Sequence, residues 1–357
     1  MPDSYSTAKI VHHPELLERM KKREQGYPIQ VHLMPQNICN QNCSFCAYRL
    51  ENYKNSEMFD DSEAIPLATM LQVLDDAKEM SVKAFEVTGG GEPLLYKHRE
   101  VMFEKMIEYG FDIALVTNGT ALTEKLARLI GAHLTWVRVS VDAGSAETYS
   151  SIREVDKSHY YKALRAIGLL RAYCTKEGVA VGAGYVVNNE NYNEIFEGVK
   201  ILKEAGAMNV RISSAYTSAG VDYYKRGVVK EASYLANKAK DELEDKDFTV
   251  YNLFDERMMN LHSKVQNYSY CGTKEILCVI GGDENVYTCC SLAFNANGLI
   301  GSIKNQSFKE LWDSLGKQRF FDRHDPRKQC QVPCLYEQRN KFMLYAMEEN
   351  PSHINFI

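Results

Sequence analysis

The chain alternates short runs rich in β-branched residues with longer stretches whose apolar positions repeat every three to four residues. The short runs favour buried strands, and the longer stretches favour amphipathic helices. Regular alternation of the two is typical of βα units around a parallel sheet. We expect strands at 29–34, 84–88, 112–117, 136–141, 180–187 and 209–213, and helices that include 66–80, 123–130, 159–173 and 192–205.

These six units predict an α/β fold, and they fit a partial (β/α)6 TIM-type barrel better than a closed eight-stranded one. Ligands of such sheets gather at the carboxyl ends of the strands. After residue 215 the pattern changes to a polar, helix-prone stretch, followed by short strand-like pieces with cysteines. We therefore divide the chain into an N-terminal segment (1–24), the barrel (25–215), a helical bridging segment (216–260) and a C-terminal domain (261–357).

Composition narrows the class of protein. The chain has 42 Lys and Arg against 47 Asp and Glu, and this balance disfavours extended nucleic-acid binding. It contains neither an apolar run of about 18 residues nor a signal-like start, so we expect no membrane span and no export. Ten cysteines in 357 residues are too few for a disulfide scaffold. We expect a cytoplasmic protein whose cysteines serve burial, catalysis or metal binding.

Three cysteines stand directly after the first expected strand. Cys39, Cys43 and Cys46 have the spacing C-x3-C-x2-C on one loop. Three thiolates can hold three irons of a 4Fe-4S cluster, which leaves the fourth iron open for chemistry. A structural zinc site would need a fourth ligand, for which His32 is a candidate inside an expected strand. Unliganded thiols are the third alternative.

The stretch CNQNCSFC, with Phe45 at the aromatic position, resembles the signature of the radical S-adenosylmethionine (radical SAM) superfamily. The resemblance implies that the amine and carboxylate of SAM chelate the open iron. One electron from the cluster would cleave SAM to methionine and a 5'-deoxyadenosyl radical, while the protein positions the reactive atom. It also implies an electron donor such as flavodoxin or ferredoxin.

The loop after the second expected strand fits the same resemblance. Its residues Gly89, Gly90, Gly91 and Glu92 are similar to the family's GGE motif, which contacts the amine of SAM. Glycines allow the backbone to approach a ligand closely and to adopt positive φ, and a carboxylate can receive an ammonium group. Taken alone, such a run is also typical of a plain turn between a strand and a helix.

Later strand ends add further candidate SAM-binding residues. Asn118 follows the third strand, where the resemblance places the ribose. Ser140 and Asp142 are similar to the family's S-x-D pattern, and we expect Ser140 to face the barrel lumen. Arg153 matches an arginine that could pair with the SAM carboxylate. The alternatives are a turn cap at Asp142 and a surface salt bridge at Arg153.

The cysteine-rich C-terminal part resembles the SPASM/twitch extension of radical SAM enzymes, a small α+β domain that holds auxiliary iron-sulfur clusters. The resemblance implies one auxiliary 4Fe-4S cluster, because four thiolates fill such a cluster completely. The implied ligands are Cys271, Cys289, Cys330 and Cys334.

Two features depart from that family pattern. Glu284 stands where the family has a hairpin glycine, and the last two cysteines are spaced C-x3-C and not C-x2-C. Cys290 could therefore replace Cys289, and Cys278 could replace Cys271. A zinc ribbon or buried thiols remain alternatives to the cluster.

These features predict a radical SAM enzyme that abstracts a hydrogen atom from a substrate carbon, with the auxiliary cluster aiding substrate oxidation or binding. About 25 residues precede the first strand, too few for a separate peptide-recognition domain, and this favours a small polar metabolite as substrate. The alternative is a maturase that modifies a ribosomal peptide or a protein side chain. A non-catalytic iron-sulfur or zinc-binding module is the alternative from another class.

Overall fold

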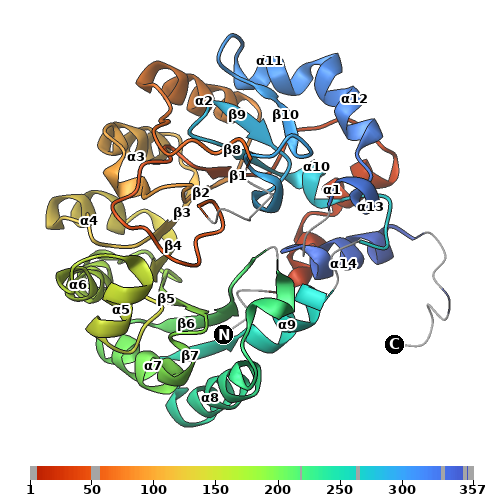
Figure 1. The fold of residues 1–357 in the computed structure, drawn as a ribbon. Helices are drawn as coiled ribbons and strands as arrows, with labels where there is room; N and C mark the ends of the chain where they lie inside the picture. Colours follow the sequence, from red (N-terminus) through yellow and green to blue (C-terminus); the bar gives the residue numbers. More distant parts are fainter. Residues whose placement is uncertain are drawn as a thin grey trace.

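The computed structural model describes residues 6–49, 57–217, 219–262, 266–330, 334–348 and 352. A ten-stranded sheet runs through the molecule in the order β10-β9-β8-β1-β2-β3-β4-β5-β6-β7, and it curls into an incomplete ring (Figure 1). The expected partial TIM-type barrel is confirmed. The strands are β1 (Gln30–Leu33), β2 (Ala84–Val87), β3 (Asp112–Thr117), β4 (Leu134–Ser140), β5 (Ala180–Val187), β6 (Asn209–Ser214), β7 (Thr249–Asn252), β8 (Leu277–Ile280), β9 (Asn285–Tyr287) and β10 (Leu299–Ser302).

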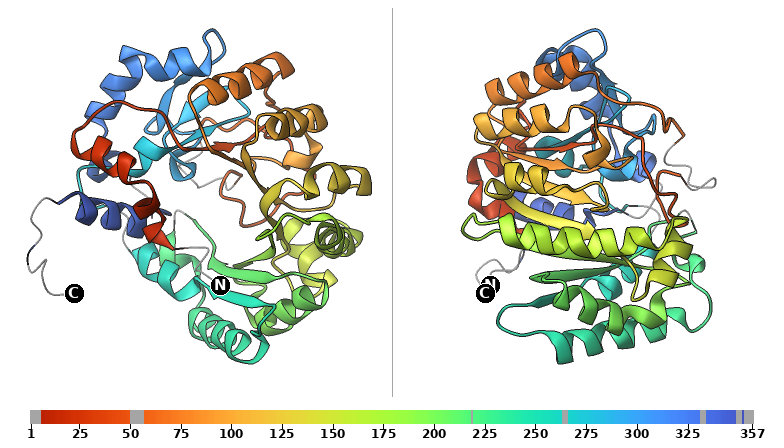
Figure 2. Two further views of the ribbon diagram at one scale, coloured as in Figure 1. Left: turned by 180° about the vertical axis from the view of Figure 1, so that it is seen from behind. Right: turned by 90° about the vertical axis from the view of Figure 1, so that its left-hand side faces the viewer.

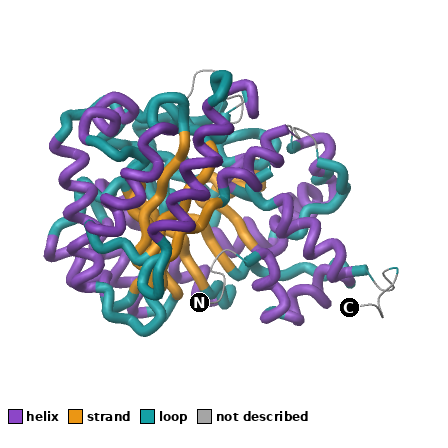
Figure 3. Tube along the Cα trace, turned by 90° about the horizontal axis from the view of Figure 1, so that it is seen from below, coloured by secondary structure: helices purple, strands orange, loops and turns teal. Residues whose placement is uncertain are grey.

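The helices that follow the first strands cover the outside of the ring, in the same order as the strands (Figure 2). Viewed from below, the strands lie enclosed between helices (Figure 3). In the described ranges, no helix is long and apolar enough to cross a membrane. The helices are η1 (Thr7–His12), α1 (Pro14–Lys21), α2 (Leu67–Glu79), η3 (Pro93–Leu95), α3 (Arg99–Glu108), α4 (Glu124–Gly131), α5 (Ala146–Arg153), α6 (Ser158–Tyr173), η4 (Tyr192–Glu194), α7 (Ile195–Glu204), η5 (Gly220–Tyr223), α8 (Val228–Leu243), α9 (Phe254–His262), α10 (Thr273–Ile276), η6 (Cys290–Leu292), α11 (Phe308–Asp313), α12 (Leu315–Arg323), α13 (Pro326–Gln329) and α14 (Glu337–Met347).

All six expected strands are present, and the sheet then continues beyond them. The segment 216–260, which we expected to be helical and bridging, carries α8 and also β7, which pairs in parallel with β6. The segment is helical over most of its length, and it also holds one short strand that was not expected. β7 has four residues and ends a polar, helix-prone stretch.

The C-terminal part is joined to the barrel through the sheet itself. β8 pairs in parallel with β1, whereas β9 pairs antiparallel with β8 and β10 antiparallel with β9. The N-terminal helices also pack here, because Leu16 and Met20 share an apolar cluster with Leu277 and Met343. The two ends of the chain thereby form one packed layer beside the first barrel strand.

Along β4, side chains point alternately toward the outer helices and toward the lumen of the barrel. Val137 and Val139 are fully buried toward the outer helices, whereas Arg138 and Ser140 are half-buried on the opposite, inner face. This alternation follows from the two-residue period of a strand. Ser140 therefore lies on the face of the sheet where we expected it.

Candidate cofactor and cluster sites

The loop with the first three cysteines is docked on the end of helix α5. The backbone N–H of Asn42 donates to the carbonyl of Arg153 at 3.1 Å, and that of Ser44 donates to the carbonyl of Ile152 at 2.9 Å. Within the loop, the N–H of Cys46 donates to the carbonyl of Cys43 at 3.0 Å. The last carbonyls of a helix have no partner inside the helix, so the docking satisfies them and holds the loop in place.

The three thiols are half-buried and close enough to act on one another. Burial raises the pKa of each thiol, and for Cys43 to about 12, although Arg153 opposes this rise. The charge of Cys46 contributes to the raised pKa of both Cys39 and Cys43. Thiols with such pKa values are poor free nucleophiles and become ligands by losing their protons to a metal. The donor set therefore fits an iron-sulfur cluster.

His32, the candidate fourth zinc ligand, is engaged elsewhere. It lies in β1, where its Nε2 is 3.3 Å from Oε2 of Glu86 on β2 and 3.0 Å from Nε2 of Gln30. Its side chain is buried between neighbouring strands and is held there by these contacts. The geometry gives no support to a zinc site that combines His32 with the cysteine loop.

The glycine loop after β2 packs directly against the chain that leads into the cysteine loop. The N–H of Gly91 donates to the carbonyl of Gln36 at 3.1 Å, and the N–H of Glu92 donates to the carbonyl of Ile38 at 2.9 Å. A Cβ at Gly91 would lie 2.2 Å from the Ile38 oxygen. In the described loop, Gly89, Gly90 and Gly91 all lack positive φ, so of the two properties that glycine offers only the close approach is used. Gly91 is needed here because two backbones approach closely.

We expect Gly91→Ala to lower the free energy of unfolding by about 1–3 kcal/mol, because its methyl group would overlap a backbone oxygen. Gly168→Ala is the matched control, since a Cβ there would be 3.8 Å from its nearest neighbour, the Ala205 oxygen, on helix α6. Alanine at that helical position should be neutral or stabilising. Anaerobic chemical denaturation of both variants measures the difference, and equal stabilities would contradict the close-packing argument.

Glu92 is a buried acceptor whose carboxylate joins its own loop to the end of β3. Its Oε1 accepts from Oγ1 of Thr117 at 2.5 Å and from the N–H of Leu94 at 3.0 Å. Its Oε2 accepts from the N–H of Asn118 at 2.8 Å. Burial raises the pKa of Glu92, while these donors oppose the rise. Both carboxylate oxygens are thus occupied inside the chain, and they align the ends of β2 and β3.

Asn118 connects the end of β3 to the cysteine loop. Its Nδ2 donates to Oδ1 of Asn40 at 2.9 Å, and its Oδ1 accepts from the N–H of Thr120 at 2.9 Å. Nδ2 of Asn40 donates in turn to Oγ1 of Thr120 at 2.9 Å. The side chain stands at the expected strand end, where it holds Asn40 between two of the cysteines.

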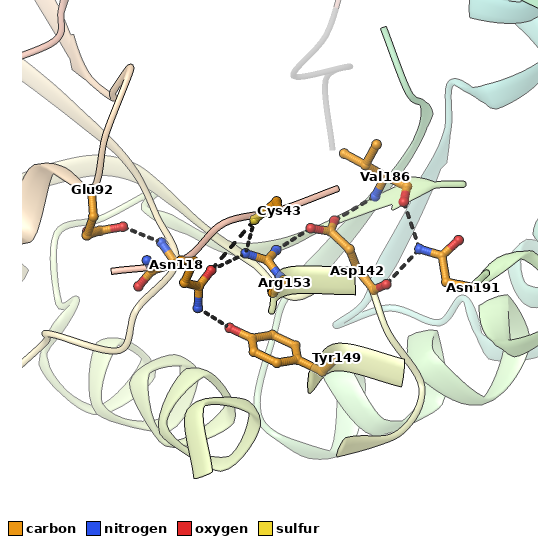
Figure 4. A network of polar contacts seen from close by, with 9 residues as sticks. Cys43, Glu92, Asn118, Asp142, Tyr149, Arg153, Val186 and Asn191 are labelled. Carbon is orange, nitrogen blue, oxygen red and sulfur yellow. Dashed lines mark hydrogen bonds and ion pairs between the residues drawn. The ribbon is translucent and has the colours of Figure 1, made fainter. Parts of the chain in front are cut away.

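Asp142 and Arg153 form a buried ion pair that reaches the cysteine loop (Figure 4). A guanidinium nitrogen of Arg153 donates to Oδ2 of Asp142, and another donates to Oε1 of Gln41 at 2.5 Å and to Sγ of Cys43 at 3.7 Å. Oδ1 of Asp142 accepts from the N–H of Val186 at 2.6 Å. Arg153 is 3 % exposed, so the alternative of a surface salt bridge is wrong.

The charges of Asp142 and Arg153 offset the unfavourable burial of each other. Burial raises the pKa of Asp142, and the charge of Arg153 opposes that rise. The φ of Asp142 is 61°, a left-handed conformation that asparagine and aspartate tolerate better than most residues. Asp142 also accepts through its carbonyl from Nδ2 of Asn191 at 2.7 Å. The residue therefore shapes its turn and also holds Arg153 against Cys43.

We expect Arg153→Gln to lower the free energy of unfolding by about 3–5 kcal/mol, because it leaves the Asp142 carboxylate buried and unpaired. The control is Arg128→Gln, which breaks the exposed pair with Glu124 and should change stability little. Denaturation of the two reconstituted variants in urea compares them. If the Arg153 variant were as stable as the Arg128 variant, the pair would not be a structural link.

Two further candidates complete this end of the sheet. The guanidinium carbon of Arg153 lies 5.9 Å from the ring centre of Phe45, which is half-buried at the cysteine loop. Ser140 pairs in register with Gly184 of β5. Both residues therefore lie at the carboxyl ends of the strands, together with the cysteine loop and the Asp142 and Arg153 pair.

The cysteines of the C-terminal part line one cavity with about 420 Å³ of space between atoms, some of it open to solvent. In the described ranges, no three His, Cys, Asp or Glu side chains converge around the position of a single metal ion. Burial raises the pKa of Cys289 and, for Cys334, to about 12. Four thiols line the cavity without converging on a single position. They belong to Cys271, Cys289, Cys330 and Cys334.

Polar groups approach these sulfurs from the cavity wall. Sγ of Cys271 donates to Oδ1 of Asn340 at 3.6 Å, and the N–H of Tyr336 donates to Sγ of Cys334 at 3.4 Å. Asn340 is itself oriented by the N–H of Thr273, which donates to its Oδ1 at 3.0 Å. Hydrogen bonds to sulfur and burial are protein features that set the reduction potential of an iron-sulfur cluster. The residues present therefore fit an iron-sulfur group.

The two alternative cysteines lie outside this cavity wall. Cys278 is fully buried in β8 and belongs to the main apolar core. Sγ of Cys290 is 3.1 Å from the hydroxyl oxygen of Tyr336, and its charge environment includes Glu86 on β2. Cys290 packs against an apolar cluster that includes Met34, although it follows Cys289 directly.

In the hairpin before Cys289, Glu284 stands where the family pattern has a glycine. Glu284 has φ 58°, the left-handed conformation for which the family pattern uses glycine. Its carboxylate is anchored, because Oε2 accepts from Oγ1 of Thr69 on α2 at 2.8 Å. The N–H of Gly281 donates to the carbonyl of Asn285 at 2.9 Å and closes the turn. Glu284 thus adopts a left-handed conformation without being a glycine, and the contact with Thr69 holds its side chain.

Several residues at the sites were missed by the reasoning from sequence. Gln41 and Tyr149 continue the hydrogen-bond chain that begins at Arg153. Arg153 donates to Oε1 of Gln41, and Nε2 of Gln41 donates to the Tyr149 hydroxyl at 2.8 Å. His324 lines the C-terminal cavity with its Nδ1 buried and without a partner among the described residues. Only the position of Gln41 inside the C-x3-C spacing could have drawn attention to it. The others come from distant elements and carry no local signal.

The fold and both sites define an iron-sulfur protein of a known class. The radical SAM superfamily model matches residues 33–202, and the SPASM iron-sulfur cluster-binding domain model matches residues 271–335. The chain belongs to the radical SAM enzyme superfamily and carries a C-terminal SPASM domain. SAM, a 4Fe-4S cluster and further iron-sulfur binding in the SPASM domain follow from that membership.

Curated relatives match only part of their own length. A GTP 3',8-cyclase of Helicobacter pylori strain J99 is 34% identical over 120 residues, which are 33% of this chain and 36% of the relative. A probable GTP 3',8-cyclase of Saccharolobus islandicus is 26% identical over 177 residues, 49% of this chain and 53% of the relative. The chain thus spans between a third and about half of these relatives.

Solved structures share the fold over most of the chain. Streptococcus suis SuiB bound to the precursor peptide SuiA has a TM-score of 0.63 at 13% identity, and the match covers 96% of this chain and 78% of that one. The structure of anSMEcpe with bound AdoMet and the Cp18Cys peptide has a TM-score of 0.61 at 17% identity, covering 91% and 92%. These likenesses show the fold.

Proposed function

We propose that this chain is a radical SAM enzyme that cleaves SAM reductively and removes a hydrogen atom from a substrate carbon. Cys39, Cys43 and Cys46 would ligate the SAM-binding 4Fe-4S cluster. When bound, the cluster and SAM supply a 5'-deoxyadenosyl radical, and the protein supplies position, orientation and exclusion of competing reactions.

The observation that carries the proposal is how the cysteine loop is held. Hydrogen bonds join it to the segments after β2 and β3 and to α5 through Glu92, Asn118 and Arg153, and Asp142 after β4 in turn holds Arg153. A loop that only served as a turn would not need buried polar anchors on four elements, since each anchor costs desolvation. A loop that presents thiols to a ligand at the strand ends does need them.

We propose distinct roles for the strand-end residues around SAM. The backbone of Gly89, Gly90 and Gly91 would border the amine end, while Glu92 acts by aligning its neighbours through the contacts described above. Asn118, Ser140 and Phe45 would border the adenosyl part. Asp142 and Arg153 would fix the orientation of Cys43, because their polar atoms are already directed at each other and at that sulfur.

Cys271, Cys289, Cys330 and Cys334 would hold one auxiliary 4Fe-4S cluster. All four line one cavity, whereas Cys278 and Cys290 do not. A completely ligated cluster can pass an electron without binding substrate at iron. We propose that it accepts the substrate electron or orients the substrate, and that a flavodoxin or ferredoxin of the cytoplasm donates an electron to the first cluster.

A small polar metabolite is the substrate that we favour. The curated relatives are named for a reaction of GTP, a small polar molecule, which supports this choice. A ribosomal peptide or protein side chain is the second candidate. Two solved structures of the same fold contain a bound peptide, and at 13% and 17% identity that likeness extends to the fold alone.

Anaerobic reconstitution with iron and sulfide tests the proposal. Two 4Fe-4S clusters require about eight irons per chain, and addition of SAM and a reductant should yield 5'-deoxyadenosine. Iron analysis and chromatography of the nucleoside products measure both results. A reconstituted sample that carried zinc alone and left SAM intact would instead establish the non-catalytic zinc-binding alternative.

A further inference from the structure

One imidazole lies in the wall of the cavity that contains the four C-terminal thiols. His324 directly follows α12, and it lines this cavity together with Cys330, which follows α13, and Asn340 of α14. Figure 1 shows α12, α13 and α14 on the same side of the ring. His324 is 4 % exposed, so protein encloses nearly all of its side chain.

The ring of His324 is held by packing and not by a polar partner. Its centre lies 5.5 Å from that of Phe320, four residues earlier on α12, with 34° between the ring planes. Nδ1 is buried and has no hydrogen-bond partner among the described residues. Leaving a buried polar atom without a partner is unfavourable, and in native proteins such an atom points to an ordered water, an ion or a bound group.

Other polar side chains of the same wall are paired with one another. Oγ1 of Thr273 donates to Oδ1 of Asn340 at 3.0 Å, and Nδ2 of Asn340 donates to the hydroxyl of Tyr268 at 3.3 Å. Oγ1 of Thr288, by contrast, is buried without a partner in the described ranges, as is Nδ1 of His324. Two groups of this wall that can donate hydrogen bonds therefore lack an acceptor from the described protein.

The group that this cavity fits is rich in acceptors. A 4Fe-4S cluster presents sulfide and thiolate sulfurs, and hydrogen bonds to these sulfurs are one of the features that set its reduction potential. In a neutral imidazole one ring nitrogen carries a proton and the other a lone pair. Beside sulfurs with negative charge, a proton at Nδ1 of His324 is attracted, whereas a lone pair there would be repelled.

We propose that the Nδ1–H group of His324 donates a hydrogen bond to a sulfur of the auxiliary cluster and raises its reduction potential. The inference rests on the proposed function, because it concerns the cluster that Cys271, Cys289, Cys330 and Cys334 would hold. Reduction adds one negative charge to the cluster, so a donor stabilises the reduced form more than the oxidised form. His324 thereby favours the cluster as the acceptor of the substrate electron.

A redox titration of the reconstituted protein, followed by electron paramagnetic resonance, tests the inference. His324→Leu removes the donor and should make reduction of the auxiliary cluster about tenfold less favourable, as for the loss of one hydrogen bond to a charged group. This corresponds to a potential lower by about 59 mV for a one-electron couple. His324→Asn is the matched control of similar size, and its amide N–H group should keep the wild-type potential. The SAM-binding cluster is the internal reference, because its potential should be equal in all three proteins.

Iron analysis of the same samples separates this role from direct ligation. Both variants should keep about eight irons per chain, because four thiolates already fill the auxiliary cluster. Loss of the auxiliary iron from both variants would make His324 an iron ligand and overturn the inference. Equal auxiliary potentials in the wild-type protein and His324→Leu would also overturn it. A potential as low in His324→Asn as in His324→Leu would assign the shift to the loss of the ring and not of its N–H group.

Failure of the proposed function gives different results. A wild-type protein that holds both clusters and forms no 5'-deoxyadenosine would contradict the proposed enzyme and leave the comparison of potentials valid. A wild-type protein without the auxiliary cluster would contradict the proposed ligand set, and the inference about His324 would fall with it. An unshifted potential with both clusters present contradicts the inference alone.

Discussion

Replacing Cys39, Cys43 and Cys46 together by alanine is expected to abolish SAM cleavage and to remove about half of the iron. These thiols are the proposed ligands of the cluster that binds SAM, and their loop contains no other cysteine. Without the cluster no electron reaches SAM, so the loss should exceed the effect of any single anchoring residue. Chromatographic assay of 5'-deoxyadenosine and iron analysis measure the two effects.

Cys174→Ala serves as the control for this experiment. Cys174 is buried at the end of α6, far in sequence from both cysteine groups, and its variant should keep all of the iron and the activity. Retention of SAM cleavage by the triple variant would show that these residues are not the ligands. Loss of all iron would mean that the two clusters are not assembled independently.

Replacing Cys330 and Cys334 by alanine is expected to remove the other half of the iron and to spare SAM cleavage in the absence of substrate. The reason is spatial, since these thiols line a cavity built from the C-terminal part, whereas the first loop is anchored on the segments after β2 and β3 and on α5. Electron paramagnetic resonance of the reduced protein should show the first cluster alone.

Cys290→Ala distinguishes the ligand sets in the same assay. Its sulfur contacts the Tyr336 hydroxyl and is absent from the cavity wall, so the variant should keep both clusters. Loss of the auxiliary signal in Cys290→Ala, with retention in Cys289→Ala, would reverse the assignment of these neighbouring residues.

The barrel was predictable because its strands carry a strong local pattern. β4 and β5 are long strands between helices; β4 alternates apolar and polar residues, and β5 is a continuous run of apolar residues and glycines. β1 to β6 also follow one another in the sheet in chain order. β7 and β8 were not predicted as strands of this sheet, because they lie outside the regular alternation of strands and helices and join the sheet through pairing with β6 and β1. Their partners lie far away in sequence, and pairing across such distances leaves no mark on a local window.

The candidate site was predictable where spacing carries the chemistry. The loop of Cys39, Cys43 and Cys46 and the glycine loop after β2 were found from short motifs with a physical reason. The way in which these loops are held was not predictable. Arg153 was expected to face SAM or solvent, and it lies instead in a buried pair with Asp142 that also touches Cys43.

Local order along the chain was enough to determine the succession of strands and helices and the positions of the thiols, because hydrophobic period and ligand spacing are properties of neighbouring residues. Only the tertiary structure decided that Cys289 lines the cavity while Cys290 packs against the apolar cluster that includes Met34, and that Arg153 is buried against Asp142. Burial and pairing depend on which distant segments meet, and the packing of the whole sheet sets those meetings.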